Sequence, residues 1–403
     1  MEKTISMDIK PQLERAVGID VHKEKLIVCF YVRDQVYEVK EYGTFTCDLY
    51  QLRDDILHYK IADVIMESTG VYWVALCAIL TTAGIKTHVV NAYFVKNMPK
   101  EKTDKKDAKW LCKLLVNGQI RDSYIAGEDQ RCFRDLCRNR TGYSHQITQV
   151  QNRILKVLER RNIKIRSVVS NMSTQTSKDI VKALSEGETD VEKLISLCLG
   201  KLKKKKELMR KALQGVLTPH DCSLLKMLLA DIAHFENNIA VMEQDIKKHT
   251  DKINPQLIKN LDDVAGIAQK GAEIILAEIG DNVDAWETAD KLAAWTGTAP
   301  GNHETANTKK YVGRRSGNTY LRTAMVQTAW SVVRMKNSYW RALFSHLNKR
   351  MHVKKAILII ARKLVKVIYK VIKGVITYKE YGAEYFVKQL QQRVQQNRPI
   401  LSR

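Results

Sequence analysis

The chain lacks the cysteine patterns that mark zinc sites and small disulfide frameworks. Its eight cysteines lie at positions 29, 47, 77, 112, 132, 137, 198 and 222, and none of them form a C-x-x-C pair. The only close pair, Cys132 and Cys137, fits neither metal-ligand spacing nor a disulfide scaffold. We therefore expect eight free thiols and a location in a reducing cytoplasm.

Long apolar runs are also missing. The first fifteen residues, MEKTISMDIKPQLER, contain no apolar core of a signal peptide. The most apolar stretch, Ala356–Ile372, contains Arg362, Lys363, Lys366 and Lys370. These charges are too frequent for a bilayer span of about 20 residues. We expect no membrane partner, with a basic helix lying on a membrane surface as the alternative.

Acidic residues are scarce, above all in the last quarter of the chain. Lys and Arg number 67 against 44 Asp and Glu, which gives a net charge of +23. Residues 301–403 contain 22 basic and three acidic residues, so +19 of that charge lies there. This excess favours nucleic acid as partner, and a solvated basic face is the plainer interpretation. The 45% apolar share excludes wholesale disorder, and 403 residues indicate two to four domains.

The order of predicted elements indicates an α/β domain over residues 1–125. Residues 16–47 contain short runs rich in Val, Ile, Phe and Tyr, which predict strands. Helix, strand, helix and strand then alternate, and a further helix is expected at about residues 104–116. Three strands followed by this alternation predict a mixed sheet covered by helices.

Two heptad seams predict a helical or coiled-coil arm over residues 126–257. Their apolar residues recur at steps of three and four: Tyr143, Ile147, Val150, Ile154 and Val157, then Leu228, Ile232, Phe235, Ile239, Met242 and Ile246. The spacing indicates an antiparallel helical pair, formed either within the chain or with another subunit. The polar insert between the seams, about residues 165–222, contains the basic run Lys201–Lys206, which is either solvated or in contact with phosphates.

Four carboxylates form a candidate metal site. Asp20 ends the apolar run VGID and Glu67 ends VIME, while Asp104 and Asp107 share one face of a helix. A carboxylate at the end of a buried strand needs a cation or a hydrogen-bond partner. Mg²⁺ prefers oxygen ligands and often bridges to phosphates, so it is the cofactor we expect. The alternative is that these acids are ordinary capping and first-turn residues.

A polar, glycine-rich loop at Gly297–Arg322 is the second candidate site, within a mainly helical region at residues 258–403. It combines hydroxyls with cations: Thr305, Thr308 and Ser316 with Lys309, Lys310, Arg314, Arg315 and Arg322. Such a loop suits a nucleophile attacking phosphate, or phosphate binding alone. Upstream, the turn around Gly266 is similar to a helix-hairpin-helix motif, with a plain packing corner as the alternative.

Together these segments resemble the DEDD transposases of the insertion sequence 110 family, relatives of the Piv DNA invertase. The resemblance covers nearly the whole chain, in family order, but not the insert. Its motifs are GIDVHK (18–23), MESTGVYW (66–73), NAYFVKNMPKEKTDKKDAKWL (91–111), LAEIGD (276–281), AAWTGTAPGNHE (293–304) and SGNTYLRTAMVQTAW (316–330).

The resemblance implies a RuvC-like domain of the RNase H fold, in which Asp20, Glu67, Asp104 and Asp107 bind Mg²⁺. It also implies a C-terminal transposase domain with a serine nucleophile, and composite sites formed between subunits. Family members are homo-oligomers, dimers or tetramers, and a structured non-coding RNA guides them to donor and target DNA.

One departure from the family pattern concerns the nucleophile. The family loop commonly reads P-G-N-H-E-S-A-G-K, whereas here Thr305 stands at the serine position and Asn307 replaces the glycine. The β-methyl of threonine restricts its χ1 angle, and the lost glycine removes backbone freedom. Three interpretations stay open: Thr305 attacks, Ser316 substitutes for it, or the protein binds DNA without cutting.

We therefore expect a DNA recombinase of the transposase kind that works through a covalent hydroxyl–phosphate linkage. One alternative is a transposase-derived nucleic-acid-binding protein without recombinase activity. Intact acids argue against it, because a pure binder has no need of carboxylates that repel phosphate. The other alternative is a metal-dependent RuvC-like nuclease that uses water as its nucleophile.

Overall fold

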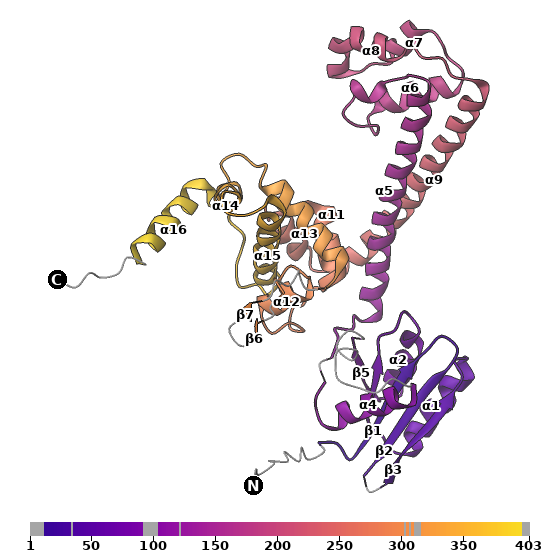
Figure 1. Ribbon diagram of the computed structural model, residues 1–403, viewed down its shortest axis with the longest axis vertical. Helices are drawn as coiled ribbons and strands as arrows, with labels where there is room; N and C mark the ends of the chain where they lie inside the picture. The colour runs from indigo at the N-terminus through magenta and orange to yellow at the C-terminus, as the bar shows by residue number, and fades with distance from the viewer. Residues whose placement is uncertain are drawn as a thin grey trace, which may run out of the picture. The chain divides into compact units, whose positions relative to one another are not determined.

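Short strands rich in β-branched residues form a five-stranded sheet near the N-terminus (Figure 1). The computed structural model describes residues 12–33, 35–91, 104–120, 122–301, 304–305, 308–309 and 316–396. The chain divides into two units between Ile125 and Ala126. The elements of the first unit are β1 (Arg15–Val21), β2 (Leu26–Val32), β3 (Gln35–Tyr42), α1 (Thr46–His58), β4 (Asp63–Glu67), α2 (Trp73–Thr82), β5 (Lys86–Val90) and α4 (Asp104–Val116).

The sheet is mixed, as the order of elements predicts. Its strands lie in the order β3-β2-β1-β4-β5. β1, β2 and β3 pair antiparallel, whereas β4 runs parallel to both β1 and β5. A mixed five-stranded sheet followed by mostly helical structure is consistent with an RNase H-like N-terminal domain.

Helices cover both faces of this sheet. On one face, α1 and α2 bury Leu52 and Leu76 against alternate residues of β1 such as Val17. On the other face, α4 buries Leu111 against Ala16 and other residues that point the opposite way. Because side chains alternate along a strand, each residue of β1 and β4 is assigned to one face by its position in the sequence.

The second unit is almost entirely helical. Its elements are α5 (Glu128–Arg160), η1 (Ile165–Ser167), α6 (Gln175–Ser185), α7 (Val191–Ser196), η2 (Gly200–Lys205), α8 (Lys206–Ala212), α9 (Pro219–Thr250), α10 (Pro255–Asp262), α11 (Gln269–Ile279), α12 (Ala289–Trp295), β6 (Glu304–Thr305), β7 (Thr308–Lys309), α13 (Thr319–Val332), α14 (Tyr339–Asn348), α15 (Val353–Ile372) and α16 (Gly382–Gln396).

The two heptad seams pair within the chain. α5 and α9 run antiparallel along each other, and the rings of Tyr143 and Phe235 lie 5.6 Å apart between them (Figure 1). Nearer the other end of the pair, the rings of Phe133 and His249 stack at 5.6 Å. The predicted antiparallel helical pair is therefore confirmed as an internal hairpin.

The segment between the paired helices is folded, although the sequence suggested a polar insert. Its short helices α6, α7 and α8 bury Ile180, Leu194 and Met209 in one apolar cluster with the facing ends of α5 and α9. These helices are too short to produce a long periodic pattern, and so their apolar residues escape a search for helical periodicity.

The apolar stretch near the C-terminus is a core helix. All of it lies in α15, whose buried residues include Ile360, Leu364 and Ile368. Among the described residues, no helix is long and apolar enough to cross a membrane. Burial of its apolar face inside the C-terminal helices excludes the alternative of a helix lying with that face in a membrane surface.

Candidate active site

The alternation of side chains directs two of the predicted acids toward α4. In β1, Ala16 packs against α4, and Asp20 lies four residues further on the same face. In β4, Ile65 packs there too, and Glu67 follows two residues later. The strands are parallel neighbours, so both acids lie at the same edge of the sheet. Asp20 and Glu67 are 8% and 7% exposed, which makes them buried carboxylates.

A glycine allows α4 to approach the sheet closely enough to bring a third acid to this edge. A Cβ at Gly18 would overlap the backbone oxygen of Ala108 and the backbone of Cys112. The thiol of Cys112 also donates a hydrogen bond to the backbone oxygen of Ala16, at 3.6 Å. Asp107 directly precedes Ala108, so this close packing places it beside Asp20.

The charges of these acids affect one another. Burial raises the pKa of Asp20 above its ordinary value, and the hydrogen bond and charge of His22 partly offset this effect. The negative charges of Asp107 and Glu67 raise the pKa of Asp20 further. Asp107 and Glu67 therefore each lie close enough to Asp20 for their charges to affect it.

Two polar side chains that the sequence did not single out contact these acids. Nε2 of His22 and Oδ2 of Asp20 are hydrogen-bonded at 3.0 Å. The hydroxyl of Thr69 donates to Oε1 of Glu67 at 3.1 Å. Both residues belong to motifs that carry the resemblance, GIDVHK and MESTG. Their position in those motifs was the one feature of the sequence that could have indicated a role at this site.

The donor chemistry of this edge fits a hard divalent cation. Its carboxylates supply oxygen ligands, and a bound cation would relieve the repulsion of Asp20 by Asp107 and by Glu67. Among the side chains that the structure describes, no group of three or more His, Cys, Asp or Glu is drawn together closely enough to hold a metal ion. The side chain of Asp104, the first residue of α4, lies outside the described residues.

The second candidate site is the loop between α12 and α13. Thr305 lies in β6 and pairs with Thr308 of β7 in a short hairpin. The side chains of Thr305 and Lys309 lie outside the described residues, as do the whole of Lys310, Arg314 and Arg315. Arg322, the remaining predicted nucleic-acid contact, lies half-buried on α13.

Ser316 lies where this loop returns to the helical body. The backbone N–H of Asn318 donates to the backbone oxygen of Trp295 at 2.9 Å. A Cβ at Gly317 would overlap the backbone of Trp295 and Gly297, so only glycine fits at this approach. Ser316 is exposed directly beside this closure.

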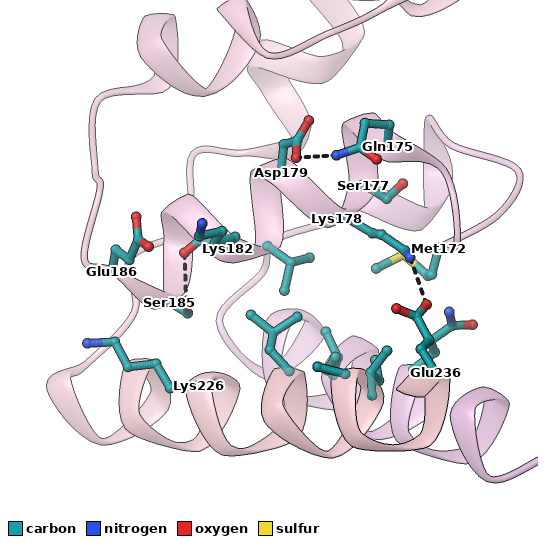
Figure 2. Close-up of a pocket in the computed structure, with 16 residues that line it drawn as sticks. Met172, Gln175, Ser177, Lys178, Asp179, Lys182, Ser185, Glu186, Lys226 and Glu236 are labelled. Atoms are coloured by element: carbon teal, nitrogen blue, oxygen red, sulfur yellow. Dashed lines mark hydrogen bonds and ion pairs between the residues drawn. The ribbon is translucent and has the colours of Figure 1, made fainter. Parts of the chain in front are cut away.

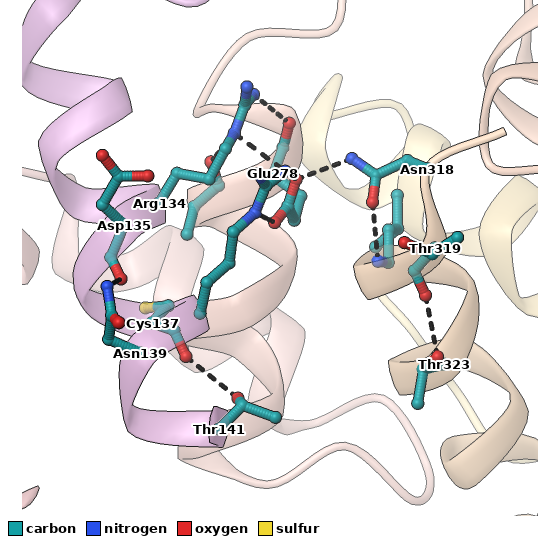
Figure 3. Close-up of polar contacts among 12 residues, drawn as sticks. Arg134, Asp135, Cys137, Asn139, Thr141, Glu278, Asn318, Thr319 and Thr323 are labelled. Atoms are coloured by element: carbon teal, nitrogen blue, oxygen red, sulfur yellow. Dashed lines mark hydrogen bonds and ion pairs between the residues drawn. The ribbon is translucent and has the colours of Figure 1, made fainter. Parts of the chain in front are cut away.

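A buried acid ties this segment to two other helices (Figure 3). Glu278 of α11 is 1% exposed, and its carboxylate accepts two hydrogen bonds from Arg138 of α5, at 2.7 and 2.8 Å. Its Oε2 also accepts from the side-chain amide of Asn318, the N-cap of α13, at 2.6 Å. The LAEIGD motif therefore contributes a residue that joins α5, α11 and the end of the loop.

The turn around Gly266 is a packing corner. Gly266 has a φ of +77°, and a Cβ there would meet Val332 and Thr328 of α13. The turn is covered by α13 on this side, which favours the plain alternative over a helix-hairpin-helix contact to phosphate.

A cavity of about 630 Å³ lies between α6 and α9 (Figure 2). Ile154 and Ile232 contribute to its lining, and Lys178 of α6 donates to Glu236 of α9 at 2.7 Å. It belongs to the packing of the helical hairpin with its insert and contains none of the predicted site residues.

Two family models match the chain and agree with this geometry. A transposase model, that of the DEDD type of IS110, matches residues 17–163, which include all four predicted acids. The model of the transposase IS116/IS110/IS902 family matches residues 258–345, which include both candidate hydroxyls. Together the matches span more than half of the chain. The protein is therefore a transposase, an enzyme that acts on DNA.

Within that class, the chain belongs to the IS110 family of transposases, which confirms the resemblance found in the sequence. Residues 164–257 and 346–403 lie outside both matched segments. No curated protein matches the chain.

Proposed function

We propose that this transposase cuts and rejoins DNA strands through a covalent bond between a hydroxyl of the loop after α12 and a DNA phosphate. The supporting observation is the proximity of Asp20, Glu67 and Asp107 at one edge of a sheet, inside the segment that matches DEDD transposases. Asp20 and Glu67 are buried, and buried acids beside another negative charge are costly to keep without a role.

The four acids serve to hold Mg²⁺. Asp20, Glu67 and Asp107 would bind the ion together with Asp104, the first residue of α4. When bound, the ion stabilises the negative charge that develops on the phosphate oxygens. His22 keeps the carboxylate of Asp20 oriented and Thr69 does the same for Glu67, because each donates to one carboxylate oxygen and leaves the other available.

Thr305 is the proposed nucleophile, with Ser316 as the alternative. The hydroxyl oxygen loses its proton and forms a bond to phosphorus while the bond from phosphorus to one DNA oxygen breaks, and that DNA oxygen takes up a proton to become a hydroxyl. The reverse attack by another DNA hydroxyl restores the side chain and rejoins the strand. Each step exchanges one phosphate ester for another, so the sequence of steps needs no external energy source.

The arrangement of domains follows the family. We assign residues 1–125 to a RuvC-like domain, 126–257 to a helical arm and 258–403 to the transposase domain. A homo-oligomer, dimer or tetramer, would combine the acids of one subunit with the hydroxyl of another, and a structured RNA would guide it. Light scattering that shows a monomer both with and without nucleic acid would remove the intersubunit part of this proposal.

The decisive experiment is the search for a covalent protein–DNA adduct. Full-length protein is incubated with Mg²⁺ and with DNA from the ends of the insertion sequence. The mixture is then denatured and separated by electrophoresis. We expect an adduct with the wild type and none with Asp20→Asn, while DNA binding is nearly unchanged, since this substitution removes no positive charge. Cleavage without an adduct would favour a RuvC-like nuclease that uses water. Binding with neither cleavage nor adduct would favour a DNA-binding protein without recombinase activity.

A further inference from the structure

A second cavity has a volume of about 680 Å³. Most of the residues that line it lie outside the segments that match the family models. It is enclosed by α14, α15, α16 and the connection between the last two helices. Five aromatic side chains contribute to its walls: Tyr339, Trp340, Tyr378, Tyr381 and Tyr385. We call it the aromatic pocket. Its size is in the range of sites that bind small organic groups, about 300–1,000 Å³.

Hydrogen bonds fix the inner wall of the aromatic pocket. The indole N–H of Trp340 donates to the hydroxyl of Tyr378 at 3.0 Å, and that hydroxyl donates to Oε2 of Glu380 at 2.6 Å. Oε1 of Glu380 accepts from the backbone N–H groups of Tyr339 and Gly382, at 2.8 and 3.1 Å. Glu380, the only acid that lines the pocket, therefore has both carboxylate oxygens hydrogen-bonded within the wall.

The outer wall exposes aromatic rings. Tyr381 and Tyr385 are 58% and 39% exposed, and their rings stack at 4.6 Å with an angle of 24°. The ring of Tyr339 lies 6.2 Å from that of Tyr385. Ordered, exposed rings of this kind offer flat faces to a ligand, and they are costly in water unless a partner covers them.

Lysines surround these rings. Lys363, Lys366, Lys370 and Lys379 line the pocket, against the single acid Glu380. Lys366 forms an ion pair with Asp290. Lys370 and Lys379 are exposed, and neither forms an ion pair within the part of the chain that the structure describes. Flat aromatic faces beside unpaired cations match a ligand that combines a planar ring with negative charge.

We propose that the aromatic pocket binds an unpaired nucleotide, with its base stacked on Tyr381 and Tyr385 and its phosphates beside Lys370 and Lys379. Stacking on aromatic rings within a basic groove is how proteins bind single strands without reading their sequence. A displaced DNA strand and an unpaired RNA segment share this chemistry. The inference rests on the proposed function in that a transposase handles such strands, but it concerns affinity and not strand cleavage.

The test separates base stacking from attraction to phosphate. Full-length protein is titrated with fluorescent oligomers of about ten nucleotides: thymidine DNA, uridine RNA and an abasic DNA of equal length. We expect the wild type to bind the thymidine oligomer about 5- to 100-fold more tightly than the abasic one. Comparable preference for the uridine oligomer identifies RNA as a second source of the ligand, and its absence restricts the pocket to DNA.

Variants assign that preference to the pocket. Tyr381→Leu should lose most of it and Tyr381→Phe should keep it, because phenylalanine retains the stacking face. Tyr50→Leu is the matched control, since Tyr50 is 44% exposed on α1, far from this pocket in the sequence, and it should have no effect. The double variant Lys370→Gln/Lys379→Gln should lower the salt dependence of binding while the preference for bases persists.

Either of two results overturns the inference: a wild type that binds abasic and thymidine oligomers equally, or a preference that Tyr381→Leu leaves intact. Both outcomes are independent of covalent adduct formation. If the protein forms adducts but shows no preference for bases, the proposed function stands and the role of the aromatic pocket is refuted. If it shows the preference but forms no adduct, the role of the pocket stands and the proposed function is refuted.

Discussion

Asn318 donates its side-chain amide to Oε2 of Glu278 at 2.6 Å, while its Oδ1 accepts the backbone N–H of Leu321 at 3.0 Å. The residue that caps α13 is therefore also fixed to α11. Arg138 and Arg134 of α5 each form an ion pair with the same carboxylate, and Figure 3 shows Arg134 beside Glu278. The loop that contains both candidate hydroxyls thus ends on a network that includes the helical arm.

Glu278→Gln should destabilise the protein strongly. The substitution preserves the shape of the side chain but leaves Arg138 without its buried counter-ion. Breaking a buried pair typically costs about 3–5 kcal/mol. The measurement is urea unfolding, with Glu287→Gln as the control, because Glu287 is an exposed partner of Lys291 and its loss should have little effect. Equal, small effects of both substitutions would contradict a supporting role of Glu278.

Gly18→Ala should reduce both stability and strand cleavage. The added Cβ has to push α4 away from β1, because it meets the backbone of Ala108 and Cys112 and not a flexible side chain. Overpacking of this kind costs about 1–3 kcal/mol, and the shift moves Asp107 relative to Asp20. Gly142→Ala, in the helix α5 with open space around it, is the control and should be neutral or stabilising. Wild-type cleavage by Gly18→Ala would show that the position of α4 does not limit activity.

The sequence predicted the acids of the site because a charge at the end of an apolar run is visible without knowledge of the fold. Asp20 and Glu67 are of this kind, and strand alternation then places both toward α4. Glu278 had no such signal, because its partners Arg138 and Asn318 are 140 and 40 residues away in the sequence. The fold of residues between the heptad helices was missed for a related reason, since the helices there are only six to eleven residues long.

Asp221 should give the helical arm a stability that depends on pH. The residue is fully buried in the cap of α9, and the hydrogen bond from Thr218 holds the pKa of Asp221 well below its usual range, assisted by Arg161 and Arg160. A lowered pKa means that the stabilisation is present above the ordinary Asp pKa of about 3.9 and decreases as the pH falls below it.

Asp221→Asn should therefore lower the free energy of unfolding by about 2 kcal/mol near neutral pH, the value typical of a hydrogen bond to a charged group. The difference from the wild type should shrink progressively below about pH 4. Urea unfolding across that range measures it. Asp251→Asn removes an exposed carboxylate at the other end of α9 and should have little effect at any pH. A difference that stays constant with pH would exclude the charge of Asp221 as its cause.

Affinity for duplex DNA should fall steeply with salt, and the basic residues of the C-terminal region should carry much of this dependence. Removal of the whole segment after Lys349 is unsuitable as a test, because it deletes the core helix α15. The exposed residues Lys349, Arg350 and Lys354 are better targets. Their replacement by Gln should reduce the slope of log affinity against log salt by at most about 2.7, at about 0.9 for each lost phosphate contact.

The matched control for this measurement replaces Lys201, Lys203 and Lys204, which lie in the basic run of the insert and in η2. We expect these changes to alter the slope less than the C-terminal ones. The opposite order would place the main DNA contact on the insert.

Thr305 should be the attacking hydroxyl, at lower efficiency than a serine in its place. The preceding residues APGNHE keep the family spacing, and Lys309, Lys310, Arg314 and Arg315 follow within ten positions, where they can stabilise charge on the phosphate. Thr305→Ser should raise the yield of covalent adduct, because it removes the β-methyl that restricts χ1. Thr305→Ala should abolish the adduct. Ser316, exposed beside the closure of the loop, is the rival. Full activity of Thr305→Ala together with loss in Ser316→Ala would identify Ser316 as the nucleophile, and no adduct from either wild type or Thr305→Ser would leave DNA binding without recombination.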